Sequence, residues 1–305
     1  MTETESGVSW LHRLGSLVAV MTYLLYVTGV LASRTTPNFL AALWTGPGAS
    51  NPSFAVPPTR YAHAFMILAV TVCILTVTFA LWLWKSNYHR YLKNLGIITV
   101  GVLIAMAIVM LSPLSNLFPP VISIAYTIGI QIFFCLTVCL ALFTRTDWRW
   151  DEPKMPDLAS PSVRQVLVFT TTAVFVQPLL GEGFRKQEIG FAPHLVLGIA
   201  VTGCSLWILE MALTKFPHLR TFKISAVLLA QLSVLQLFLG IISLSMNLNA
   251  RAASGPQPGL VVMNVTHEAV GILVLATSLF VTCQGFKYFE PPGRGTHPSI
   301  LSDHP

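Results

Sequence analysis

The sequence of 305 residues has few charged side chains, with Asp, Glu, Lys and Arg together making up 10%, against roughly 25% in an ordinary soluble domain. This scarcity excludes a soluble globular protein. The 54% of hydrophobic residues excludes a disordered chain, which needs low hydrophobicity and high net charge. Alternating ten-residue segments are also missing, which argues against an outer-membrane barrel. The remaining class is a membrane protein built from helices.

Cysteine is scarce as well, and its positions exclude further classes. None of the five cysteines lies in a connecting loop, so the sequence contains neither a disulfide framework nor a zinc motif. We expect them to be small buried apolar side chains. They are Cys73, Cys135, Cys139, Cys204 and Cys283.

The basic residues predict a membrane orientation rather than a nucleic-acid partner. The isoelectric point near 9.2 reflects 18 Lys and Arg, but these sit in short clusters between apolar runs. If the N-terminus is cytoplasmic, thirteen of them lie on the inner side and five on the outer side. Both termini are therefore expected to be cytoplasmic, in a multi-pass protein of the cell inner (plasma) membrane.

Eight apolar stretches are long enough to cross a lipid bilayer, at about 20 residues each. They cover residues 14–33, 61–84, 95–113, 120–143, 163–181, 192–213, 223–246 and 261–286. The longest polar connection, residues 144–162, divides them four plus four. An even number of spans precedes it, so the second half enters the membrane in the same orientation, which permits a parallel repeat.

The expected fold is therefore an all-α polytopic membrane protein of two tandem four-helix bundles in a pseudo-two-fold repeat. The expected units are an N-terminal half over residues 1–146, a cytoplasmic linker over 147–162, a C-terminal half over 163–288 and a flexible cytoplasmic tail over 289–305.

Two histidines inside the spans carry the main functional signal, because titratable groups in a membrane are costly and few. His194 and His267 each have a glycine four residues later, Gly198 and Gly271, on the same helix face. A porphyrin fits such a slot while the imidazole binds iron, and the two histidines have similar depths near the outer face. Glu268, beside His267, either tunes the ligand or is hydrated. Alternatively, each histidine bonds a neighbouring helix and the glycines serve close packing.

Basic residues near the first histidine are candidates for the carboxylates of a porphyrin. Arg185 and Lys186 lie in a short outer loop, against the general bias of basic residues toward the inside. Arg251 is a second outer candidate. The alternative is that these are ordinary loop charges, paired with Glu182 and Glu188.

The first half carries an altered version of the pattern. His63 stands at the start of the second span as His194 does at the start of the sixth. The fourth span has no histidine, and Tyr126 is the polar residue where a partner is expected. Neither has a glycine four residues later, so the first half reads as a degraded or altered copy.

These residues resemble the heme A synthase family, eight-helix proteins of cytochrome oxidase assembly built from two four-helix halves. The resemblance covers roughly residues 10–288. It is carried by residues 177–185, 193–198, 232–240 and 266–278, and in the first half by residues 131–142.

The resemblance implies one heme b held by His194 and His267, with Gly198, Gly271, Arg185 and Lys186 around it, and a substrate heme (heme O or A) in the first half. It implies oxidation of a heme O methyl group to the formyl group of heme A, with water as the oxygen source. The implied partners are the heme substrate, a heme O synthase and respiratory oxidase components.

The chain departs from the family in the first half. His63 matches the first histidine there, but Arg60 stands where a glutamate is expected and Tyr126 stands at the second histidine position. Lys186 replaces a histidine that often follows the arginine. Exchanging glutamate for arginine reverses the charge and removes an acid/base group.

Three functional readings follow from these residues. In the first, the chain is an active oxidase of the heme A synthase type, in which His63 acts with a second group, either Tyr126 or a proton path through water. In the second, it is a degenerate heme b protein that serves electron transfer or structure in a respiratory complex. A helical transporter with incidental histidines is the third, and the lack of pore-like charges and broken helices argues against it.

Overall fold

The computed structural model describes residues 3–35, 60–111, 119–149, 153–157, 159–250 and 258–291. Within them are eight α-helices that are long and apolar enough to cross a membrane, and no strand beyond one isolated bridge. The chain is a multi-pass all-α membrane protein, as its composition predicts. The helices are α1 (Glu3–Thr35), α3 (Arg60–Lys85), α4 (Arg90–Leu111), α6 (Pro119–Phe143), α7 (Val163–Arg185), α8 (Ala192–Thr214), α9 (Arg220–Ala250) and α10 (Pro258–Tyr288).

The side chains of these helices are apolar on both the packed and the outward faces. In α3, Phe65, Val72 and Phe79 are buried against other helices, while Ile67 and Ile74 on the opposite face are exposed. A helix that is apolar all round faces lipid rather than water on its outer side. Helices suit this environment because their backbone hydrogen bonds are satisfied internally. All five cysteines are free and lie within the helices.

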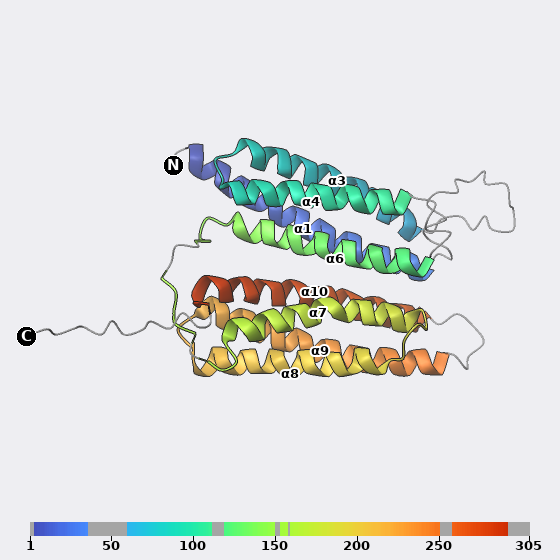
Figure 1. Cartoon of the computed structure of the whole chain (residues 1–305). Helices are drawn as coiled ribbons and strands as arrows, with labels where there is room; N and C mark the ends of the chain where they lie inside the picture. Colours follow the sequence, from blue (N-terminus) through green and yellow to red (C-terminus); the bar gives the residue numbers. More distant parts are fainter. Residues whose placement is uncertain are drawn as a thin grey trace, which may run out of the picture.

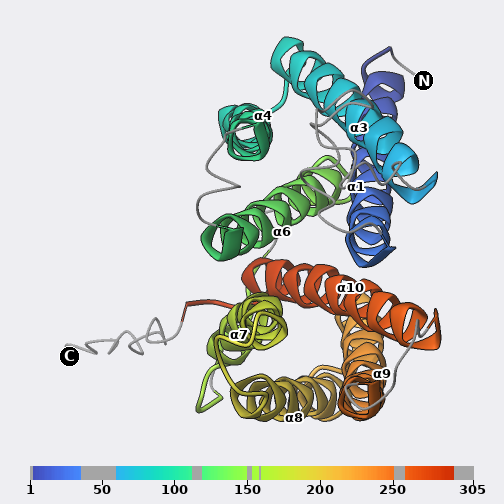
Figure 2. The same ribbon diagram turned by 90° about the vertical axis from the view of Figure 1, so that its right-hand side faces the viewer.

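The eight helices form two groups of four, α1 to α6 and α7 to α10 (Figure 1). In each group every helix packs against the next one in the chain, and the last packs against the first. Figure 2 shows the second group, α7 to α10, as a ring in which α8 and α10 stand at opposite corners. The halves meet where α10 packs on α1 and α6, and where α6 packs on α7.

The linker and the predicted tail differ from expectation where they meet. The backbone N–H of Met155 donates to the oxygen of Tyr288 at 2.8 Å, and that of Glu290 donates to the oxygen of Met155 at 2.9 Å. Phe289 is fully buried. The prediction that the tail begins at residue 289 is wrong for these residues, because the Phe289 ring packs on Phe216 and Phe222 and backbone hydrogen bonds to Met155 hold them in place. Residues 292–305 of the predicted tail lie outside the described residues.

Candidate functional site

A cavity of about 590 Å³ lies inside the second half and reaches the boundary with the first half. Its size falls in the range of roughly 300–1,000 Å³ that is usual for small-molecule and cofactor sites. The walls come from all four helices of the second half and from α1, α3 and α6 of the first. Apolar side chains and glycines dominate the lining, with a limited set of polar groups among them.

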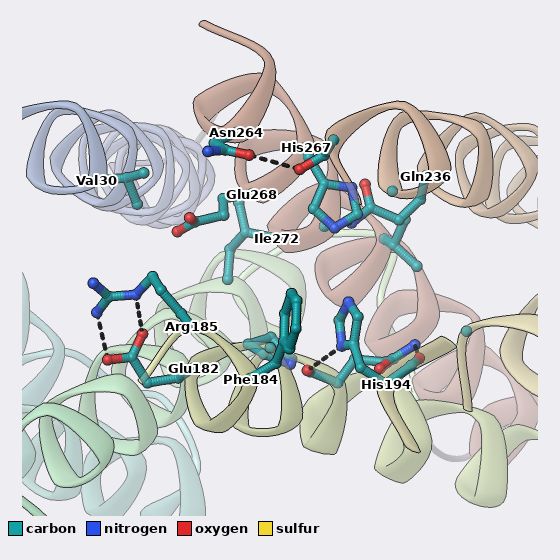
Figure 3. Close-up of a pocket in the computed structure, with 18 of the residues that line it drawn as sticks. Val30, Glu182, Phe184, Arg185, His194, Gln236, Asn264, His267, Glu268 and Ile272 are labelled. Atoms are coloured by element: carbon teal, nitrogen blue, oxygen red, sulfur yellow. Dashed lines mark hydrogen bonds and ion pairs between the residues drawn. The ribbon is translucent and has the colours of Figure 1, made fainter. Parts of the chain in front are cut away.

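Both histidines singled out by the sequence line this cavity and face each other across it (Figure 3). His194 comes from α8 and His267 from α10, the two diagonal helices of the ring. Their ring centroids are 6.2 Å apart and the ring planes are nearly perpendicular, at 78°. The sequence predicted a pair at similar depth, and the structure brings the two rings together.

The His194 ring is held in one orientation by its neighbour on α7. Its Nδ1 lies 3.1 Å from the backbone oxygen of Gln177, and a carbonyl only accepts, so Nδ1 carries the proton. The side-chain amide of Gln177 in turn donates to the backbone oxygen of His194 at 3.1 Å. In the neutral ring Nε2 is then the unprotonated nitrogen, which is the form that binds a metal.

The second histidine has a similar glutamine neighbour but unsatisfied polar atoms. The side-chain nitrogen of Gln236 lies 3.4 Å from Nε2 of His267. Among the described residues, Nδ1 of His267 and Oε1 of both Gln236 and Gln177 are buried without a hydrogen-bond partner. Such atoms cost about 1–3 kcal/mol each when left unpaired, and they are typical of functional sites.

Glycines bring the helix backbones against the imidazoles, but in a different arrangement from the predicted one. A Cβ atom added at Gly181 would lie 3.3 Å from Cε1 of His194. One added at Gly240 would lie 3.0 Å from Cε1 of His267. At Gly198 and Gly271 the added atom would instead meet a glutamine amide nitrogen at 2.9 Å. The slot beside each imidazole is therefore formed by a glycine of the neighbouring helix, because the glutamine side chain covers the glycine that follows the histidine.

The second half contains a short internal repeat that the sequence reasoning missed. Gln177 precedes Gly181 by four residues on α7, and Gln236 precedes Gly240 by four on α9. Each of these helices is followed by one that carries His-x-x-x-Gly. The ring is thus two similar helix pairs that place one glutamine and one histidine each at the cavity. The sequence signal for this repeat is that a glutamine precedes a glycine by four residues on both α7 and α9.

The predicted basic residues behave differently from one another. Arg185 lines the cavity, and its guanidinium forms a two-point ion pair with Glu182, which also lines it (Figure 3). Lys186 follows α7 as its C-terminal cap and is not among the lining residues. The pairing with Glu182 matches the alternative of ordinary loop charges. Arg251 lies outside the described residues.

Glu268 joins the two halves instead of standing free in water. Its carboxylate pairs with the guanidinium of Arg34 on α1, and both side chains line the cavity. They are 30% and 23% exposed, respectively, so the pair is partly withdrawn from solvent. This contact is a charged link between α1 and α10 beside the His267 ring.

We expect that link to contribute to stability. Arg34→Ala leaves the partly buried Glu268 carboxylate without its partner and should lower the melting temperature. Adding Glu268→Gln to that variant should recover part of the loss. The coupling free energy between the two residues should be about 1 kcal/mol. Thermal unfolding in detergent of the wild type, both single variants and the double variant gives the coupling. Arg145→Ala breaks the exposed Arg145–Asp147 pair and serves as the control, with an effect within about 0.5 kcal/mol. Additive single effects would show that the two groups are not coupled.

The structure separates the two residues expected at a first-half site. His63 is exposed, on the same outward stripe of α3 as Ile67 and Ile74, and is not among the cavity-lining residues. Tyr126 does line the cavity, together with the second-half histidines. Arg60 is exposed and contacts the adjacent Tyr61, its guanidinium 5.0 Å from the ring centre and a nitrogen 3.0 Å from the hydroxyl.

The paired imidazoles fit a heme iron better than a bare metal ion. Metal–imidazole bonds of about 2.0–2.1 Å on both sides of one metal put the ring centroids roughly 6.3 Å apart, close to the observed 6.2 Å. Among the described residues no group of three or more His, Cys, Asp and Glu is placed to bind a metal. Two donors are too few for zinc, whereas a porphyrin brings its own four nitrogen ligands.

Comparison with known proteins adds no further assignment: no protein-family model and no curated protein matches the sequence.

Proposed function

We propose that this chain is a membrane protein that binds one heme b between His194 and His267 and exchanges electrons through it. The observation that carries the proposal is the pair of imidazoles, 6.2 Å apart, on diagonal helices across a glycine-lined cavity. The resemblance to the heme A synthase family rests on the same residues and supports it.

The surrounding residues have defined tasks in this proposal. The backbone oxygen of Gln177 keeps the proton on Nδ1 of His194 and leaves Nε2 available. Gly181 and Gly240 leave room for a flat macrocycle beside the rings. Arg34 and Arg185 are the cavity-lining cations available to heme carboxylates, and each shares its charge with a glutamate. Bound heme would supply one-electron redox chemistry, with His194 and His267 as the residues that hold its iron.

Oxidation of heme O to heme A, with a second heme in the first half, is the other candidate function. The resemblance favours it, but the positions of the first-half residues do not. His63 faces outward and Tyr126 lines the second-half cavity, so these two residues do not form a joint site. For this reason we prefer a heme b protein for electron transfer or structure in a respiratory assembly.

A pigment assay distinguishes the two candidates. The chain is co-expressed with a heme O synthase in a host that lacks heme A, and the hemes are extracted and separated by chromatography. We expect heme b with the purified protein and no heme A in the membranes, because His63 and Tyr126 do not form a joint acid/base site among the described residues of the first half. A parallel culture that expresses an active heme A synthase is the control. Heme A in the test culture would establish the oxidase and overturn our preference.

The positive-inside bias supports a finer placement of this multi-pass protein. We propose that it resides in the cell inner (plasma) membrane with both termini cytoplasmic. Figure 1 has the start of α1 and the end of α10 at the same end of the bundles, which is consistent with that orientation. The family resemblance predicts a heme O synthase and respiratory oxidase components as partners.

A further inference from the structure

The cavity continues beyond the histidines into a pocket at the boundary between the halves. We call this part the inter-half lobe and define it by Tyr26, Gly29, Phe65, Tyr126 and Ile130, all of which line the cavity. The Tyr26 side chain packs against the hydrophobic cores of both halves. The lobe is therefore continuous with the space between the imidazoles, yet it is built from first-half residues.

Two phenol groups stand in this lobe with no assigned task. Tyr26 and Tyr126 are partly buried within membrane spans, and neither hydroxyl has a hydrogen-bond partner among the described residues. Two other tyrosines are paired: the Tyr88 hydroxyl donates to the backbone oxygen of Thr144, and that of Tyr61 accepts from Arg60. Both residues line the cavity and neither hydroxyl is among the fully buried unpartnered atoms, so the two hydroxyls open onto the cavity. Two such donors without a protein partner in one cavity indicate a ligand with acceptor atoms.

The chemistry of the lobe restricts that ligand. Its other walls are apolar or aromatic, from Phe65, Ile130 and Leu25, and the Phe65 ring packs directly against the backbone of Gly29. Aromatic rings in such walls pack well on a flat ligand. The nearby charges of Arg34 and Glu268 neutralise each other. A suitable ligand is therefore neutral, flat, soluble in lipid and equipped with acceptor oxygens.

We propose that the inter-half lobe binds an isoprenoid quinone, with the hydroxyls of Tyr26 and Tyr126 as donors to its carbonyl oxygens. The electron-transfer role of this site rests on the proposed heme function, whereas binding of the quinone does not. Oxidation of one quinol to a quinone releases two electrons and two protons. The chain would hold one heme, so the electrons would pass to its ferric iron one at a time, with a one-electron acceptor of the respiratory assembly reoxidising the iron between the two transfers and the two protons released to water. A quinone held in the lobe would exchange electrons with a heme held by His194 and His267 without binding its iron.

The binding test uses the purified full-length protein and decylubiquinone as the probe. Titration calorimetry in detergent compares the wild type with Tyr26→Phe, Tyr126→Phe and the double variant, which keep the aromatic packing and remove only the hydroxyls. We expect the double variant to bind at least tenfold more weakly and each single variant to fall between. Tyr23→Phe is the matched control, because Tyr23 lies one turn earlier on α1 and does not line the cavity; its affinity should stay within twofold.

Several results would overturn the proposal. One is that decylubiquinone does not bind to the wild type. Another is that it binds to the double variant as tightly as to the wild type. A third is that a decyl-chain alcohol, which lacks the quinone ring, binds to the wild type as tightly as decylubiquinone does. A second measurement follows reduction of the ferric heme by decylubiquinol in stopped flow, where the double variant should be at least tenfold slower. Tyrosine-dependent quinone binding by a protein without a heme spectrum would uphold this site and defeat the heme proposal. A protein that shows the heme spectrum but does not bind the quinone would support the heme proposal and defeat the quinone site.

Discussion

Replacing either His194 or His267 with alanine is expected to abolish the low-spin, bis-histidine heme b spectrum of the purified protein. Each imidazole supplies one of the two axial ligands, and the described residues offer no third His, Cys, Asp or Glu grouped with them to take over. Loss of one ligand leaves the iron with a weak or absent sixth ligand and a changed spin state. The measurement is the absorption spectrum of oxidised and dithionite-reduced protein, with the pyridine hemochrome giving the heme content.

Two controls separate a lost ligand from a misfolded chain. His63→Ala removes an intramembrane histidine that lies outside the cavity and should leave the spectrum unchanged. Free imidazole added to His194→Ala or His267→Ala should restore part of the low-spin spectrum, because it occupies the space of the deleted ring. An unchanged spectrum in a heme-loaded His194→Ala protein, or its loss in His63→Ala, would contradict the assignment.

The helices were predictable because their signal is local. A span needs about 20 apolar residues whatever surrounds it, and lipid leaves the backbone few alternatives to a helix. Each of the eight predicted stretches falls on one helix, apart from residues 112–113, which lie outside the described residues. The tail boundary was missed because the burial of Phe289 depends on its contacts with Phe216 and Phe222, which no local pattern reveals.

The candidate site was predictable only in part. His194 and His267 stand near the starts of the predicted spans 192–213 and 261–286, which run in the same direction, and this predicted a similar depth. In the structure α10 begins earlier, at Pro258, so His267 is its tenth residue, whereas His194 is the third residue of α8. The neighbours of each ring depend on which helices are adjacent. Hence the roles of Gln177 and Gly240, on helices antiparallel to those of the histidines, were not foreseen. Tyr126 was assigned to the first half because it belongs to a first-half helix, yet its side chain lines the cavity of the second.

The link between Arg34 and Glu268 shows the same limit. The two residues are far apart in the sequence, and each alone reads as a hydrated charge near the membrane surface. Their pairing arises from the packing of α1 on α10, a consequence of how the two halves dock. Contacts of this kind connect the cavity to both halves. They cannot be predicted from the residue pattern of a single helix, because they depend on which helices pack together.

Gly240→Leu is expected to reduce heme occupancy at least tenfold while the protein still folds. A single Cβ at this position would already lie 3.0 Å from Cε1 of His267, so an alanine forces the ring to shift by a few tenths of an ångström. A leucine adds three further carbons on the cavity-lining face of α9 and removes the space beside the imidazole. The measurement is the heme-to-protein ratio of purified variants, with Gly240→Ala expected to lie between leucine and the wild type.

The matched control for this substitution is Gly203→Leu. Gly203 lies on α8, has nothing within 4 Å of an added Cβ and is exposed on the outer surface. Leucine is a good helix former and is apolar, so this variant should keep full heme occupancy and equal or higher thermal stability. If Gly240→Leu bound heme as well as Gly203→Leu does, the space between the α9 backbone and His267 would not be part of the heme site. The imidazole pair would then need another explanation, as a contact that only packs α8 against α10.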